Sequence, residues 1–140
     1  MIVLDTDHLS CLEWGSEKSA ILRARLAEAS DRKIVVSIAS YEEQMRGWMA
    51  LLANTPDVKR QVDAYSRLPK HLQLYCSVPL LDFSALAAER FIELRRRKIR
   101  IGTMDLKNAA SCLCENAMLL TRNTIDYSKP PGLRFEDWTR

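Results

Sequence analysis

Short apolar stretches alternate along the chain with longer segments in which apolar residues recur every three or four positions. The stretches at 2–4, 33–38, 78–83 and 118–121 are rich in aliphatic and β-branched residues, which predicts buried strands. The continuous apolar run in "KIVVSI" indicates burial on both faces, as in a parallel sheet. The stretch "LRFEDW" at 133–138 is expected to form a last edge strand.

The segments between these strands have helical periodicity. Helices are predicted at 8–14, 18–29, 40–53, 55–75, 85–97 and 105–117. Asp7 is the expected cap of the first helix, Ser40 and Glu43 have capping-box spacing in the third, and Pro69 is expected to interrupt the fourth. Strands that alternate with helices predict an α/β fold, with a central, mostly parallel sheet of four to five strands flanked by helices on both sides.

Length and composition fit one domain over residues 1–140, since 47% of the 140 residues are apolar. No apolar run approaches the roughly 20 residues that a membrane-spanning helix needs, and the N-terminus lacks the features of a signal peptide. The four cysteines contain no CxxC pair, which favours buried thiols in a reducing compartment over a zinc site. We therefore expect a cytoplasmic protein with no membrane partner.

Four carboxylates lie where the chain leaves a predicted strand or enters a helix. Asp5 ends the first strand, and Glu43 lies in the first turn of the helix after the second. Asp105 opens the helix before the fourth strand, and Asp126 follows that strand by five residues. Because functional groups gather at the carboxyl ends of parallel strands, we expect these four acids to lie near the same edge of the sheet. Four carboxylates close together repel one another and stay ionised only if a positive group lies among them. Mg²⁺ and Mn²⁺ are the expected cations, because they prefer oxygen ligands.

Several stretches, taken together, resemble the PIN domain, and within it the toxins of VapBC-type toxin–antitoxin pairs. They are "VLDTD" at the start, "SIASYEEQMRG" at 37–47, "IGTMDLKNAA" at 101–110, "LLTRNTIDY" at 119–127 and "GLRFEDW" at 132–138. They occur in the family's order and span nearly the whole chain. The resemblance implies a PIN-like fold and a metal-dependent endoribonuclease, in which a metal-activated water attacks the phosphodiester and leaves a 5′-phosphate.

The resemblance also assigns site residues. The matched acids, expected to be both catalytic groups and ligands of Mg²⁺ or Mn²⁺, are Asp5, Glu43, Asp105 and Asp126. The family's glutamate lies four residues before a glycine, which favours Glu43 over Glu42, although the choice stays open at this point. Thr121 and Asn123 match the family's supporting polar positions, with Tyr127 in place of a phenylalanine. Lys107 and Asn108 replace aliphatic residues, so we expect that part of the helix to face a partner or solvent.

Charge fits such a nuclease. With 21 basic and 18 acidic residues the net charge is +3, and setting the four site acids aside leaves +7 on the rest of the chain. A basic body attracts phosphates. The basic run expected to contact RNA, or else to be a solvated helix end, is Arg95, Arg96, Arg97, Lys98 and Arg100.

The resemblance further implies partners: an RNA substrate, a cognate antitoxin and a second copy in a homodimer. The helix at 40–53 is apolar nearly all round, with Trp48 and Met49 among its apolar residues and Trp14 nearby in the sequence. Such a surface is either buried in the core or covered by a partner segment.

Two other functions stay open. "LDTDHLS" also resembles the start of haloacid-dehalogenase-like phosphatases, in which Asp5 would be the nucleophile and Asp7 an acid/base. Only 19 residues follow Thr121, however, which leaves too little chain for the later motifs of that family. The other alternative is a non-catalytic PIN-like module that binds RNA or a protein.

Overall fold

A computed structural model describes residues 1–140, the side chain of Trp14 excepted. One sheet contains five strands in the order β3-β2-β1-β4-β5, and all neighbouring strands are parallel. The strands are β1 (Ile2–Leu4), β2 (Ile34–Ser37), β3 (Leu80–Leu81), β4 (Met118–Leu120) and β5 (Arg134–Glu136). The predicted parallel α/β sheet is therefore confirmed, and so is the last edge strand.

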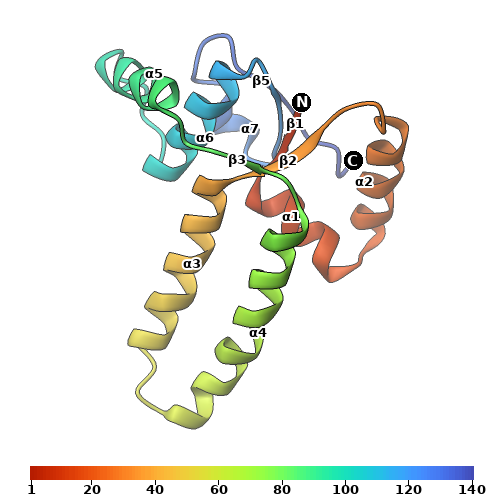
Figure 1. Ribbon diagram of the computed structural model, residues 1–140, viewed down its shortest axis with the longest axis vertical. Helices are drawn as coiled ribbons and strands as arrows, with labels where there is room; N and C mark the ends of the chain where they lie inside the picture. Colours follow the sequence, from red (N-terminus) through yellow and green to blue (C-terminus); the bar gives the residue numbers. More distant parts are fainter.

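Seven helices connect and cover the strands. They are α1 (Thr6–Trp14), α2 (Glu17–Glu28), α3 (Ile38–Ala53), α4 (Val58–Ser77), α5 (Ala85–Arg96), α6 (Thr103–Cys114) and α7 (Thr124–Tyr127). Figure 1 shows α3 and α4 as an antiparallel pair that projects from the sheet, with α1 and α2 to one side and α5 to α7 to the other. None of the helices in the described chain combines the length and apolar character that a membrane crossing requires.

The central strand is buried on both faces, as its apolar sequence predicts. Leu4 packs in one cluster with Leu9 of α1 and Leu22 of α2. Val3, whose side chain points to the opposite face, packs in a second cluster with Ala109 of α6. The core thus forms two layers, and the sheet between them brings the ends of β1, β2 and β4 to one edge.

The start of α3 differs from the prediction. Ser37 is its N-cap, because Ser37 Oγ accepts a hydrogen bond of 3.0 Å from the backbone N–H of Ser40. The helix therefore begins at Ile38, and Ser40 lies inside it. The predicted capping box of Ser40 and Glu43 is wrong, which leaves Glu43 without a capping role.

The helix α4 also differs from the prediction. Its N-cap is Asp57, whose Oδ1 accepts a hydrogen bond of 2.9 Å from the N–H of Lys59, so the helix begins at Val58 and not at the predicted residue 55. Pro69 lies inside the helix without interrupting it. Proline removes one hydrogen bond to the carbonyl group four residues earlier, that of Tyr65, and both residues are exposed. Water can therefore bond to the freed carbonyl group, and the helix continues.

Candidate active site

The carboxyl ends of β1 and β4 place two polar side chains in contact. The strands are parallel neighbours, so Asp5 and Thr121, the residues that follow them, lie side by side. Thr121 Oγ1 donates a hydrogen bond of 2.8 Å to Asp5 Oδ2. Asp105, in the first turn of α6, and Asn123, before the first turn of α7, are joined by a bond of 3.4 Å. One edge of the sheet thus gathers polar groups from four segments.

Asp5 is buried, with 4% of its surface exposed. Its Oδ1 accepts hydrogen bonds from the N–H of Thr6 at 2.9 Å and from Asn108 Nδ2 at 3.4 Å. Burial, and then the charge of Asp7, raises the pKa of Asp5 to about 7, against the opposing bonds from Thr121 and Thr6. The folded protein thus keeps a carboxylate where ionisation is unfavourable without a cation nearby.

Asp105 is half-buried and bonded by two side chains. Its Oδ1 accepts a hydrogen bond of 3.0 Å from the Tyr127 hydroxyl, and its Oδ2 accepts the bond from Asn123. Burial raises the pKa of Asp105, the Tyr127 bond opposes the rise, and the charges of Asp126 and Asp7 add to it. Asp105 therefore experiences the same accumulation of negative charge as Asp5.

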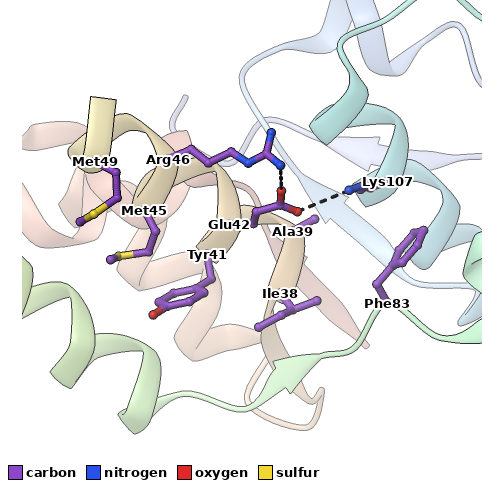
Figure 2. A pocket seen from close by; sticks show the side chains of 9 residues that line it. All are labelled: Ile38, Ala39, Tyr41, Glu42, Met45, Arg46, Met49, Phe83 and Lys107. Carbon is purple, nitrogen blue, oxygen red and sulfur yellow. Dashed lines mark hydrogen bonds and ion pairs between the residues drawn. The ribbon is translucent and has the colours of Figure 1, made fainter. Parts of the chain in front are cut away.

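Glu42 and Glu43 have different surroundings. Glu42 lies 2.7 Å from Arg46 Nη2 and 3.4 Å from Lys107 Nζ at the edge of an apolar pocket, as Figure 2 shows. Glu43 is exposed and lies on the solvent side of the group formed with Asp5 and Asp105. Partial desolvation, and then the charge of Asp105, raises the pKa of Glu43. Two cations therefore neutralise Glu42, whereas Glu43 interacts electrostatically with the acidic group.

Asp126 lies at the outer side of this group. Lys129 Nζ donates to it at 2.7 Å and Asn123 Nδ2 at 3.1 Å, and these two bonds lower the pKa of Asp126. Lys129 also donates to the backbone carbonyl of Arg100 at 3.1 Å. Asp126 is thus already paired with a cation, and the end of the basic segment lies beside it.

Asp7 forms hydrogen bonds that stabilise the site, and it does not cap α1. The N-cap is Asp5, so the helix begins at Thr6. Asp7 Oδ1 lies 2.7 Å from Nδ1 of the buried His8, and Asp7 Oδ2 accepts a bond of 2.8 Å from the N–H of Arg122. Both oxygens of Asp7 are thus engaged within the chain.

The donor set fits a hard divalent cation. None of the ion pairs formed by the described side chains includes Asp5, Glu43 or Asp105. Among those same side chains, no three His, Cys, Asp or Glu groups lie close enough to hold one metal ion as placed. Mg²⁺ is usually held by only one or two carboxylates and keeps several waters. The unpaired carboxylates of Asp5, Glu43 and Asp105 therefore suit such an ion. Water would complete its coordination.

Asn108 is a site residue that sequence reasoning missed. It was expected to face a partner or solvent, yet it is 0% exposed and its Nδ2 lies 3.4 Å from Asp5 Oδ1. Its other partners are the hydroxyl groups of Ser37 and Ser40, and its side chain also interacts with the Tyr127 hydroxyl. The pattern that could have revealed it is the pair of serines in "VVSIAS", since two buried hydroxyl groups need polar partners.

Comparisons with known proteins bear on the family and the fold. The profile of the PIN domain family matches residues 2–130. Ribonuclease VapC2 of Rickettsia felis is 34% identical over 65 residues, a match that covers 44% of this chain and 48% of that protein.

Two solved structures share the fold. VapBC-1 from nontypeable Haemophilus influenzae has a TM-score of 0.70 at 23% identity and covers 100% of both chains. VapBC2 from Rickettsia felis, bound to a DNA fragment from its promoter, has a TM-score of 0.70 at 23% identity and covers 99% of both.

Proposed function

Because the chain belongs to the PIN domain family, we propose that it is a metal-dependent endoribonuclease and the toxin of a toxin–antitoxin pair. The observation that carries this proposal is the group of Asp5, Glu43 and Asp105, whose charges interact and which none of the described cations neutralises. The names of its relatives, a VapC ribonuclease and VapBC complexes, support the same function.

In this proposal Asp5, Glu43 and Asp105 surround Mg²⁺ or Mn²⁺, one or two of them in direct contact and the rest through its waters, and Asp126 contributes from the outer side. When bound, such an ion lowers the pKa of a water molecule and stabilises negative charge on the phosphate. The carboxylates would orient the ion, from the buried Asp5 on one side to the exposed Glu43 on the other. Asp126 is the weakest member of the set, because its pairing with Lys129 must loosen before it can reach the ion.

The supporting polar residues act on the carboxylates. Thr121 holds Asp5 through Oδ2, and Tyr127 holds Asp105 through Oδ1. Asn123 donates to both Asp105 and Asp126. These bonds keep the acid oxygens oriented before metal and substrate arrive, which is what a precise site requires.

The basic run at 95–98 and Arg100 is proposed to bind the RNA backbone. These side chains are exposed. Lys129 contacts both Asp126 and the carbonyl group of Arg100, so the run ends close to the acids. A phosphate backbone lying along it would reach the metal site, and its affinity would fall as salt is added.

The proposed antitoxin has a groove to occupy. A cavity of about 890 Å³ lies between α1, α3 and α4, lined by apolar and charged residues that include Trp48, Leu51 and His71. Leu51 is 48% exposed and Met49 is 46% exposed, so α3 does not bury all its apolar residues in the core. The buried His71 Nδ1 has no hydrogen-bond partner among the described residues. The predicted contribution of Trp14 lies outside the described side chains.

An apolar helix with polar flanks matches this groove. A basic side chain of that partner, most simply an arginine, would inhibit cleavage by reaching the acids in place of the metal. The homodimer and the single-domain organisation over 1–140 stay predictions.

The test of the proposed function is cleavage of purified structured RNA by the purified chain. We expect cleavage with Mn²⁺ or Mg²⁺ and none with EDTA. Asp5→Asn or Asp105→Asn should slow it at least about a hundredfold while circular dichroism stays native. Asp126→Asn should be milder, because Lys129 and Asn123 already engage this carboxylate. Cleavage in EDTA, or a fully active Asp5→Asn variant, would contradict the proposal.

A further inference from the structure

A buried polar cluster borders Asp5. Its members are Asn108 on α6, Ser37 at the end of β2 and Ser40 on α3, and all three are buried. Ser37 Oγ is bonded to Asn108 Oδ1 and lies 3.1 Å from Ser40 Oγ. Asn108 Nδ2 lies 3.3 Å from Ser40 Oγ and 3.4 Å from Asp5 Oδ1. The cluster therefore joins three elements to the residue that follows β1.

Donors and acceptors determine which way the Asn108 amide faces. A carboxylate can only accept hydrogen bonds, so the amide nitrogen faces Asp5 and the amide oxygen faces Ser37. The Ser37 hydroxyl hydrogen then belongs to Asn108 Oδ1, because that oxygen has no hydrogen of its own. The Ser40 hydroxyl in turn donates to Ser37 and accepts one amide hydrogen. The second amide hydrogen of Asn108 is left for Asp5, with the Tyr127 hydroxyl as the other group that interacts with this amide.

We infer that Asn108 is a positioning residue, which orients Asp5 for the divalent cation and is itself in contact with neither metal nor RNA. This inference rests on the proposed function, since it takes Asp5 to be a ligand. Thr6 and Thr121 hold Asp5 from the segments that follow β1 and β4, and Asn108 holds it from α6. An aliphatic residue at position 108 would fill the space but would donate nothing.

The distances indicate how Asn108 acts. A separation of 3.4 Å is long for an N–H···O bond, so Asn108 contributes orientation more than binding strength. Partners of this kind, which contact a metal ligand and not the metal, typically change metal affinity by about 10-fold to 100-fold when they are removed. Asn108→Leu removes the donor and keeps a side chain of similar size. We expect it to weaken Mn²⁺ binding within that range.

The experiment measures the Mn²⁺ dissociation constant of the full chain, by electron paramagnetic resonance of the free ion at constant pH. Circular dichroism establishes that each variant is folded. A purely structural role would lower the melting temperature and leave the dissociation constant of the folded protein unchanged. If Asn108→Leu does not fold, Asn108→Ala serves instead. Ser37→Ala, which removes the donor that orients the amide, should weaken binding less than the Asn108 variants.

Ser111→Ala is the matched control. Ser111 is also buried on α6, about one turn further along, and its Oγ donates to the backbone carbonyl of Lys107 at 3.0 Å. Its loss should leave Mn²⁺ affinity unchanged. If the wild type binds Mn²⁺ and the Asn108 variants bind it equally well, the inference is overturned and the proposed function stands. If the wild type binds no Mn²⁺, both are overturned.

Discussion

The hydroxyl group of Tyr127 donates a hydrogen bond of 3.0 Å to Asp105 Oδ1, although the tyrosine is 0% exposed. Burial, and then the nearby charge of Asp5, raises the pKa of Tyr127, so the phenol stays protonated and its hydrogen is available for Asp105. The bond ties α7 to the first turn of α6. It also opposes the rise that burial imposes on the pKa of Asp105.

Tyr127→Phe should therefore weaken metal binding in a pH-dependent way. Without the hydrogen bond the pKa of Asp105 rises further, and protons compete better with Mn²⁺. We expect affinity about threefold to tenfold below wild type at pH 6, as the loss of one hydrogen bond implies, and close to wild type at pH 8. Mn²⁺ titrations at both pH values check this. Equal affinities at pH 6 would contradict it.

Asp5 should make the metal-free protein less stable as pH rises. Its pKa is about 7 in the folded chain against an ordinary value of 3.8, so between these values the folded state binds a proton that the unfolded state releases. The free energy of unfolding then falls from about pH 4 to about pH 7, by a few kcal/mol at most. Urea unfolding in EDTA over this range measures the slope. Asp5→Asn should flatten it, and an unchanged slope would be inconsistent with a buried, titrating Asp5.

Added metal should raise the melting temperature. An ion that binds only the folded state stabilises it by RT ln(1 + [L]/Kd). Millimolar Mn²⁺ or Mg²⁺ should stabilise the wild type and leave an Asp5→Asn, Asp105→Asn double variant unaffected. The control with the same change in charge is Glu28→Gln with Asp31→Asn, two exposed acids near the start of β2. If metal raises the melting temperature of the Asp5→Asn, Asp105→Asn variant as much as that of the control, Asp5 and Asp105 are not the metal ligands.

The two glutamates on α3 should respond differently to amide replacement. Glu42 is paired with Arg46 and Lys107, whereas the pKa of Glu43 is raised partly by the charge of Asp105. Glu43→Gln should reduce RNA cleavage at least about a hundredfold, and Glu42→Gln by no more than a few fold. Cleavage rates under saturating Mn²⁺ compare them. The opposite ranking would make Glu42 the ligand.

Much of the fold follows from the sequence, because the apolar runs are short and clearly bounded. Strand β1 and its partners could be located from their aliphatic residues, and parallel pairing from the helices between them. Helix starts were less predictable. Asp5 and Asp7, like Ser37 and Ser40, are competing caps two or three residues apart, and tertiary contacts decide between them. In both cases the residue at the strand end is the cap, so each helix begins directly after its strand.

The candidate site was only partly predictable for a related reason. Asp5 and Asp105 are placed by strand ends and helix starts, which sequence patterns reveal. Asn108 depends on which face of α6 meets β2 and α3, and an isolated polar residue in a helix is usually exposed. The hydrogen bond from the Arg122 N–H to Asp7 joins residues 115 positions apart, which no local pattern can indicate.

The groove between α1, α3 and α4 gives the last prediction. Leu51 lines it and is nearly half exposed, so replacing it does not disturb the core. Leu51→Asp should weaken binding to a co-expressed antitoxin encoded beside this chain at least about tenfold and relieve inhibition of RNA cleavage. Leu86→Asp, an exposed leucine on α5, is the matched control and should bind normally. Pull-down and cleavage assays measure both. A Leu51→Asp complex as tight as wild type would place the antitoxin elsewhere, and a wild-type complex that cleaves RNA as fast as the free protein would exclude inhibition at the acids.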